Sequence, residues 1–264
     1  MSASPIDRLL AIMARLRDAD AGCPWDREQT YATIVPHTVE EAYEVAEAIE
    51  AGDMAALKDE LGDLLFQVVF YAQMAREDGI FDFHDVAATI ADKMVRRHPH
   101  VFAGARIASA DAQAVAWEAQ KDRERAGKAA NGRPPSVLNG VSVALPALTR
   151  AVKLQKRAAR VGFDWPDARS VLPKIVEELD EVTAELAGGD AERLENEFGD
   201  LLFACVNLAR KLNIDPEGAL RRGNRKFERR FRCVEDGLAA AGKRPEDADI
   251  AEMEGLWNIA KRDE

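Results

Sequence analysis

Residues 177–203 read EELDEVTAELAGGDAERLENEFGDLLF, and residues 40–66 read EEAYEVAEAIEAGDMAALKDELGDLLF. Each stretch carries one pair of carboxylates before a glycine-containing break and a second pair after it, and the second pair is followed by an apolar run. The later carboxylates are Glu178, Glu181, Glu197 and Asp200, and the earlier ones are Glu41, Glu44, Glu60 and Asp63. Each carboxylate of the earlier stretch lies 137 residues before its counterpart in the later one. The chain therefore contains two copies of one unit, without insertions between these positions.

The composition favours an all-α fold. The 264 residues allow one large domain or two small ones. Ala, Leu, Glu and Arg are abundant, aromatic residues make up only 6% of the chain, and no good run of alternating β-branched residues occurs. We therefore expect two tandem helical-bundle domains.

Further echoes set the limits of each unit. KMVRR at 93–97 resembles KFERR at 226–230, and WEAQKDRE at 117–124 resembles WNIAKRDE at 257–264. Between the units, ERAGKAANGRPPSVLNG at 124–140 is rich in Gly and Pro and lacks helical periodicity. The sequence thus predicts a first domain at 1–130, a linker at 131–142 and a second domain at 143–264.

Apolar periodicity and turn signals predict ten helices. Those of the first unit cover 5–18, 38–50, 53–78, 83–97 and 110–125, and those of the second cover 145–158, 168–187, 190–212, 215–239 and 247–262. Asp53 and Asp190 follow glycines and are expected to cap the next helix. Asp215 before Pro216 predicts a third capped start.

The carboxylate spacing predicts a site in each helical hairpin. Members of a pair three residues apart share one face of a helix. The midpoint of Glu178 and Asp200 is residue 189, as is the midpoint of Glu181 and Glu197. The first unit has the same symmetry about Gly52. Antiparallel helices about these turns would bring four carboxylates together, where they either splay into water or bind cations.

The ligand chemistry indicates which metal would bind. Every candidate ligand is a carboxylate and no Glu-x-x-His occurs, which argues against a di-iron bundle. Carboxylate oxygens suit Mg²⁺, with Mn²⁺ as a substitute. Because Mg²⁺ commonly bridges carboxylates to substrate phosphates, a phosphorylated substrate is expected.

Charge and hydropathy exclude several other classes. The net charge of −11 argues against a nucleic-acid partner, which normally needs a basic surface. No apolar stretch is long enough for a membrane span, and no signal segment is seen at the N-terminus. The three cysteines are too few and too scattered for a disulfide framework. We expect a cytoplasmic protein without a nucleic-acid or membrane partner.

The motifs resemble those of a known family. Glu-Glu-x-x-Glu followed by Glu-x-x-Asp is similar to the signature of the all-α nucleoside triphosphate pyrophosphohydrolases. GCPWDREQT, ELGDLLFQVVFYAQMA, RRHPHVF, GFDW and KFERRF look like the two-domain bacterial members of the MazG family, over about residues 6–262. The resemblance implies Mg²⁺-dependent hydrolysis of nucleoside triphosphates to monophosphates and pyrophosphate, a house-cleaning role for the nucleotide pool, and a homodimer.

The resemblance also implies roles for individual residues. Glu178, Glu181, Glu197 and Asp200 would be the catalytic Mg²⁺ ligands, with Glu41, Glu44, Glu60 and Asp63 as a second set in the first unit. The nucleotide would contact Lys174, Ile175, Val176, Glu177, Glu178, Arg193, Leu194, Glu195, Asn196, Asp200, Lys226, Phe227, Glu228, Arg229, Arg230 and Trp257.

The second unit is the preferred catalytic unit. Its carboxylates follow a basic helical face at 153–160, whereas the first unit has fewer basic residues upstream. Glu177 and Glu40 are candidates for orienting the attacking water or else face solvent. Trp257 either stacks on the base or belongs to a core or dimer interface.

Two alternatives remain open from the sequence. One is a narrower pyrophosphohydrolase that acts on dUTP, dCTP or phosphoribosyl-ATP with the same carboxylates. The other is a non-enzymatic helical module for dimerisation or regulation, in which bound Mg²⁺ only neutralises charge.

Overall fold

A computed structural model describes residues 4–104, 109, 113 and 136–263 of the chain. Every regular element among these residues is helical, so the predicted all-α class is confirmed. The chain forms two compact units, Met1–Asp122 and Arg123–Glu264. Residues 131–135 of the predicted linker, and all of the predicted helix at 110–125 except residue 113, lie outside the described residues.

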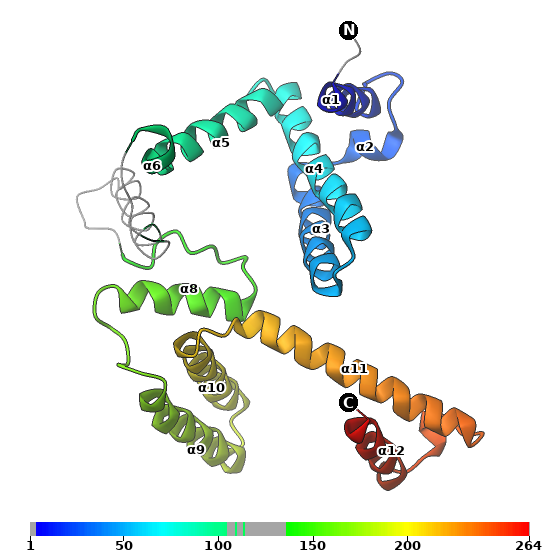
Figure 1. Cartoon of the computed structure of the whole chain (residues 1–264), viewed down its shortest axis with the longest axis vertical. Helices are drawn as coiled ribbons and strands as arrows, with labels where there is room; N and C mark the ends of the chain where they lie inside the picture. Colours follow the sequence, from blue (N-terminus) through cyan, green and yellow to red (C-terminus); the bar gives the residue numbers. More distant parts are fainter. Residues whose placement is uncertain (1–3, 105–108, 110–112, 114–135, 264) are drawn as a thin grey trace. The chain divides into compact units, whose positions relative to one another are not determined.

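The first unit is built around a helical hairpin. Its elements are α1 (Pro5–Leu16), α2 (Pro24–Glu28), α3 (Tyr31–Ala51), α4 (Met54–Glu77), α5 (Phe83–Arg97) and α6 (Pro99–Phe102). Helices α3 and α4 lie side by side, while α1 and α5 pack against the C-terminal half of α4 (Figure 1). The core of this unit joins α1, α3 and α4 through Met13, Ile34, Val69, Phe70 and Met74.

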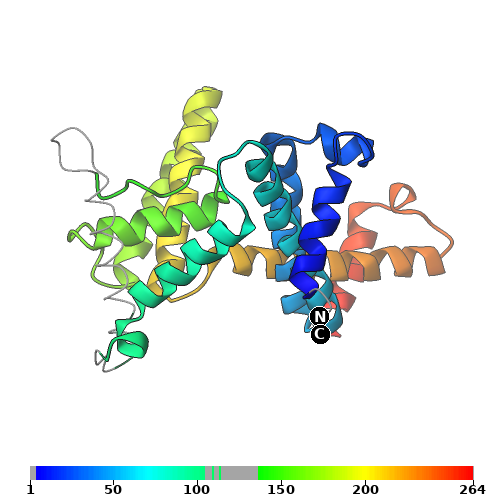
Figure 2. The ribbon, with the colours of Figure 1, turned by 90° about the horizontal axis from the view of Figure 1, so that it is seen from above.

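The second unit contains the equivalent hairpin. Its elements are α8 (Ala147–Ala159), η1 (Arg169–Val171), α9 (Leu172–Gly188), α10 (Ala191–Lys211), α11 (Pro216–Ala240), η2 (Pro245–Asp247) and α12 (Ile250–Arg262). Helices α9 and α10 pair, and α8 packs across α10 and the start of α11. Helix α12 lies beside the half of α11 that points away from α9 and α10 (Figures 1 and 2).

Both hairpins turn at a left-handed glycine followed by an aspartate cap. Gly52 has φ 70° and Gly189 has φ 74°, values that cost a residue with a Cβ atom more than they cost glycine. Asp53 accepts from the backbone N–H groups of the next helix at 2.9 and 3.0 Å, and Asp190 does so at 3.1 and 3.2 Å. The predicted turns and both caps are therefore confirmed.

The start of α3 differs from the prediction at residue 38. The helix begins at Tyr31, after a Thr30 cap that accepts from the Thr33 N–H, and continues through Pro36. Proline at that position removes the hydrogen bond to the Ala32 carbonyl, and this is why the sequence favoured a later start. The equivalent Pro173 lies in the first turn of α9, where no such bond is lost. The short helices α2 and α6 were also not predicted.

Each hairpin exposes the same stripe of large apolar side chains. In the first unit the stripe contains Val35, Val39, Ile49, Leu61 and Leu65, and in the second it contains Leu172, Val176, Leu186, Phe198 and Leu202. Each member lies 137 residues from its counterpart. An apolar helix face that its own unit leaves exposed is typical of an interaction surface.

The described helices include none that combines the length and the apolar character needed to cross a bilayer.

Candidate metal and substrate site

The hairpin geometry brings carboxylates from two helices together in each unit. Glu178 of α9 lies near Glu197 and Asp200 of α10, and each of the three offers an oxygen within 4.8 Å of those of the others. Glu41 of α3, with Glu60 and Asp63 of α4, forms the equivalent group. The facing of the helix pairs predicted from their midpoints is thus seen in both units. We refer to these groups as the second and the first carboxylate cluster.

The fourth predicted member of each cluster lies at its edge. Glu44 and Glu181 are exposed and do not belong to the close groups of three. They still interact with them. Burial first, and then the neighbouring Glu178 carboxylate, raise the pKa of Glu181. Burial first, and then the Glu44 and Asp63 charges, raise the pKa of Glu60. Within each cluster, the negatively charged carboxylates therefore repel one another.

Glu178 is the most deeply placed carboxylate of the second cluster. The residue is only 4% exposed, and its Oε2 atom is buried without a hydrogen-bond partner among the described residues. Its Oε1 atom lies 2.7 Å from the Lys174 Nζ, which is also 2.9 Å from a Glu177 oxygen. A buried carboxylate oxygen without a partner is costly, and a divalent cation bound by Glu178, Glu197 and Asp200 would satisfy it. The donor set therefore fits a hard cation such as Mg²⁺ or Mn²⁺.

The first cluster is supported by an amide instead of an ammonium. Gln67 is 7% exposed, and its Nε2 lies 3.5 Å from the Glu41 Oε1. Its own Oε1 is buried without a partner in the described structure. Burial first, and then the Asp63 and Glu44 charges, raise the pKa of Glu41. Sequence reasoning missed Gln67, although it is the one polar residue in LLFQVVF and Ala204 occupies the equivalent position.

The other predicted substrate residues near the second cluster lie on α9 and α10. Ile175 and Val176 belong to α9 with Lys174, while Arg193, Leu194, Glu195 and Asn196 belong to the first two turns of α10. The Arg193 side chain is exposed, and its Nε lies 3.5 Å from the Asp190 carboxylate. Lys174, Ile175 and Val176 thus lie at the start of α9, far from the hairpin turn, whereas the four α10 residues follow that turn directly.

The remaining predicted substrate residues form a separate group on α11 and α12. These are Lys226, Phe227, Glu228, Arg229, Arg230 and Trp257. The Phe227 and Trp257 ring centroids are 5.3 Å apart, and the Arg230 guanidinium lies 5.7 Å from the Trp257 ring centroid. Because α12 flanks the half of α11 that points away from the hairpin, one chain does not bring this group to its own cluster (Figure 1).

One residue of the predicted basic face on α8, Arg157, stabilises the local fold. The Arg157 guanidinium donates to the carbonyls of Val137 and Asn139 and thereby ties the preceding loop to the helix. At the end of α10, Arg210 and Lys211 bind Asp164 of the GFDW motif. The hydrogen bond from Arg210 is the first cause that lowers the pKa of Asp164.

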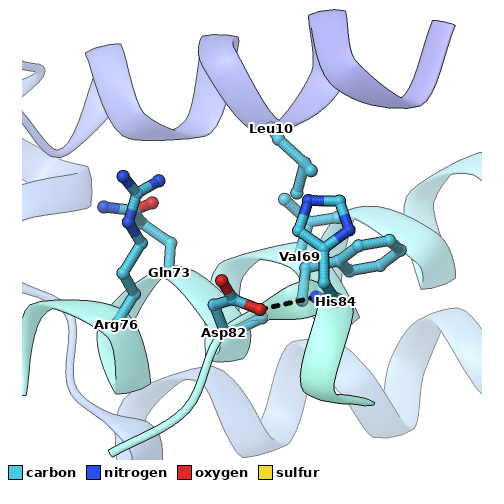
Figure 3. Close-up of a pocket in the computed structure, with 8 residues that line it drawn as sticks. Leu10, Val69, Gln73, Arg76, Asp82 and His84 are labelled. Carbon is cyan, nitrogen blue, oxygen red and sulfur yellow. Dashed lines mark hydrogen bonds between the residues drawn. The ribbon is translucent and has the colours of Figure 1, made fainter. Parts of the chain in front are cut away.

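A small cavity in the first unit lies between α1, α4 and the start of α5. It has a volume of about 40 Å³, and Leu10, Val69, Gln73, Arg76, Asp82 and His84 are among its lining residues (Figure 3). Asp82 caps α5 there, accepting from the His84 backbone N–H at 2.7 Å. The volume suits one or two water molecules and is far below that of a nucleotide pocket. None of the clustered carboxylates lines it.

Comparison with known proteins agrees with this arrangement. A model of the MazG nucleotide pyrophosphohydrolase domain matches the chain twice, at residues 29–102 and 167–234. Each match contains one carboxylate cluster and its hairpin.

Full-length relatives are similar over both units. A nucleoside triphosphate pyrophosphohydrolase of Escherichia coli is 54% identical over 98% of each chain. The Thermotoga maritima nucleoside triphosphate pyrophosphohydrolase/pyrophosphatase MazG is 43% identical over 97% of this chain and 95% of the relative. A nucleoside triphosphate pyrophosphohydrolase of Mycobacterium tuberculosis is 31% identical over 96% of this chain and 65% of the relative. The chain therefore belongs to the MazG nucleotide pyrophosphohydrolase family.

Proposed function

We propose that this chain is a Mg²⁺-dependent hydrolase that converts nucleoside and deoxynucleoside triphosphates to monophosphates and pyrophosphate, with the second unit as the catalytic one. The observation that carries the proposal is the buried Glu178 carboxylate of the second cluster. Its Oε1 pairs with Lys174, and its Oε2 has no hydrogen-bond partner among the described residues. The same activity is named for full-length relatives at 54% and 43% identity. A cytoplasmic house-cleaning role for the nucleotide pool is part of the proposal.

The second cluster supplies the metal ligands in this proposal. Glu178, Glu197 and Asp200 would hold Mg²⁺, or Mn²⁺ as its substitute, with Glu181 at the edge. The bound cation supplies charge neutralisation of the triphosphate and polarisation of its phosphoryl oxygens. In the first unit, Glu41, Glu60 and Asp63, with Glu44 at the edge, would hold a cation in a structural or regulatory role.

Two kinds of side chain would bind the rest of the nucleotide. Lys174 presents an ammonium at the edge of the cluster, where negative charge of the triphosphate needs a partner. Phe227 and Trp257 offer aromatic faces for a base, with Arg230 beside them for phosphate or base contact. Glu177 is 57% exposed and held by Lys174, so it is available to orient a water molecule once Lys174 moves to an anion.

A second copy of the chain would complete this site. Within the second unit, the aromatic group on α11 and α12 lies apart from the hairpin, and each unit taken by itself leaves the apolar stripe of its hairpin exposed. Stripes from two copies would bury each other in a bundle of antiparallel helices. We therefore expect a homodimer in which one protomer supplies the carboxylates and its partner supplies base contacts.

The activity is tested on purified full-length protein with Mg²⁺. The eight common nucleoside and deoxynucleoside triphosphates are supplied one at a time, and products are identified by chromatography. Glu197→Gln and Asp200→Asn are compared with the matched variants Glu60→Gln and Asp63→Asn of the first unit. The expected result is monophosphate plus pyrophosphate, lost in the first pair of variants and retained in the second.

Other results would contradict separate parts of the proposal. Loss of turnover only in the Glu60 and Asp63 variants would move catalysis to the first unit. Bound Mg²⁺ without product from any nucleotide would support a non-enzymatic module. Turnover of a single nucleotide, with dUTP and phosphoribosyl-ATP included in the panel, would support a narrower enzyme.

The dimer is tested by light scattering on the same protein. Leu202→Glu places a charge in the second stripe and should shift the mass from dimer to monomer. Ile250→Glu is the control, because Ile250 is also a large apolar residue and is even more exposed, at 69% against 45% for Leu202, but lies outside the stripe. A monomeric wild-type chain with full activity would contradict the shared site.

A further inference from the structure

The two clusters differ most in what accompanies their innermost carboxylate. In the second unit the Lys174 ammonium lies 2.7 Å from Glu178. In the first unit the equivalent residue is His37, whose Nδ1 lies 3.7 Å from the exposed Glu40 instead of from Glu41. Among the described residues, the hydrogen-bond partner of the Glu41 side chain is the neutral Gln67 amide, at 3.5 Å. In the part of the chain that the structure describes, an ammonium thus accompanies the innermost carboxylate of the second cluster and none accompanies that of the first.

We propose that Lys174 is an internal counter-ion of the second cluster, which leaves Glu178 when a polyphosphate binds. The second cluster then takes up a divalent cation together with polyphosphate, whereas the first takes up a bare cation. This inference rests on the proposed function, in that it assumes that a polyphosphate and a cation meet at the second cluster.

Electrostatics oppose a bare cation at the second cluster. A divalent ion bound by Glu178 would lie next to an ammonium that already occupies the same carboxylate, and the two cations repel. The Lys174 ammonium lies 2.7 Å from Glu178 and 2.9 Å from Glu177, so it is held between two carboxylates at the cluster. A divalent cation and this ammonium therefore compete for the same Glu178 carboxylate.

Lys174 has room to make that movement. Its side chain is 34% exposed, and its second partner Glu177 is 57% exposed, so the flexible stem leads from the buried carboxylate to the surface. A polyphosphate at the cluster edge offers the ammonium a new anionic partner. The released Glu178 oxygens, one of them already without a hydrogen bond, are then free for the metal.

The described residues place no such ammonium beside Glu41 in the first cluster. Glu41 lies beside Glu60 and Asp63, and its hydrogen-bond partner in the described structure is the uncharged Gln67 amide. The Gln67 amide is buried and keeps its hydrogen bond to Glu41 without adding charge. A divalent cation entering this cluster gains attraction without displacing an ammonium.

The first experiment measures Mn²⁺ binding to the full chain by electron paramagnetic resonance, without nucleotide. The double substitution Glu60→Gln/Asp63→Asn leaves only the second cluster, and Glu197→Gln/Asp200→Asn leaves only the first. Bare Mn²⁺ should bind the first cluster more tightly. Adding Lys174→Met should tighten binding at the second cluster by about tenfold, since an adjacent positive charge is removed.

Matched variants test whether charge is the cause. Lys174→Gln should act like Lys174→Met, and Lys174→Arg should leave binding weak. His37→Lys, which places an ammonium at the equivalent position of the first unit, should weaken bare Mn²⁺ binding there. Unchanged or weaker binding in both neutral Lys174 variants would overturn the inference, because Lys174 would then only order Glu178 for the metal.

A second experiment measures the coupling between metal and polyphosphate. The affinity for an α,β-methylene nucleoside triphosphate is determined by calorimetry with and without Mg²⁺, on protein with only the second cluster. The ratio of the two affinities should fall by about tenfold in Lys174→Met, because coupling between two ligands is reciprocal. An unchanged ratio would mean that Lys174 only contacts phosphate, and would overturn the inference.

The outcome is separable from that of the proposed function. Pyrophosphate release by the wild type, with Mn²⁺ binding that is indifferent to the charge at residue 174, would reject the counter-ion alone. Absence of product, with the expected Mn²⁺ results, would reject the enzyme while retaining the internal cation.

Discussion

The two hairpins share a backbone and differ in charge. Both turn at a left-handed glycine, both are capped by an aspartate, and both gather three carboxylates within 4.8 Å. Yet position 37 is His where 174 is Lys, and position 67 is Gln where 204 is Ala. Duplication has kept the geometry of the cluster, while its electrostatics depend on neighbours outside the motif. A complete set of ligand residues is therefore a poor guide to which unit is catalytic.

The largest expected difference between the units is in turnover. Glu178→Gln should lower kcat by on the order of hundredfold or more, because it removes the charge of the innermost ligand in the proposed catalytic unit. Glu41→Gln makes the same change in the first unit and should leave kcat within about threefold of the wild type. Steady-state assays of both variants at saturating Mg²⁺ provide the measurement.

One result would contradict the assignment of catalysis to the second unit alone. Equal losses in Glu178→Gln and Glu41→Gln would mean that both clusters are catalytic or that each depends on the other. Circular dichroism spectra of both variants serve as the control for folding.

A second comparison concerns the packing beneath each hairpin. Ile34 and Val171 are equivalent in the repeat and are 1% and 0% exposed. Ile34→Ala should lower the free energy of unfolding of the first unit by about 3 kcal/mol, and Val171→Ala that of the second by about 2 kcal/mol, since fewer buried methyl groups are lost. Hydrogen exchange resolved by unit provides the measurement, because the two compact units need not unfold together.

The increase in hydrogen exchange should be specific to the substituted unit. Each substitution should increase exchange mainly in its own unit. A single global increase from either variant would show that the units unfold as one.

A smaller effect is expected at the turns. Asp53→Ala and Asp190→Ala each remove two hydrogen bonds to the start of a helix and should each cost about 1 kcal/mol. Chemical denaturation followed by exchange in α4 and α10 measures both. Unequal costs would show that the two turns differ in more than their caps suggest.

The smallest predicted effect is a pH-dependent one in the first cluster. The pKa of Glu60 is raised above 4.5 by burial and by the Glu44 and Asp63 charges. The folded state therefore binds more protons than the unfolded state just above pH 4.5, and stability is lost as pH rises through the folded pKa. Without metal, Glu60→Gln should raise the melting temperature at pH 7.5 and have little effect near pH 4.5.

Metal addition should cancel this difference. Saturating Mg²⁺ at pH 7.5 relieves the repulsion in the wild type but finds one charged ligand fewer in Glu60→Gln, so the wild type should gain more from Mg²⁺. Differential scanning calorimetry with and without a chelator provides the measurement. A larger gain in Glu60→Gln would contradict cation binding at the first cluster.

Several features followed from local sequence signals. Gly52 and Gly189, each followed by an aspartate, predicted both turns, and the midpoint symmetry of the carboxylates predicted that they face each other. The start of α3 at Tyr31 did not follow, because the penalty of Pro36 inside the helix is offset by the Thr30 cap and by packing of Ile34 in the core. Local signals are reliable where one residue fixes the backbone and unreliable where packing decides between two tolerable starts.

The sequence alone determined the all-α class, the repeat, the hairpin turns and the eight carboxylates from which the two clusters are drawn, because these depend on residue type and on spacing along a helix. Only the tertiary structure decided that Glu178 is buried with one oxygen unpaired, that Lys174 pairs with it, and that Gln67 supports Glu41 in the other unit. It also decided that Trp257 joins Phe227 on α11 and not the hairpin. Burial and side-chain pairing arise from contacts between helices, and no periodicity within one helix encodes them.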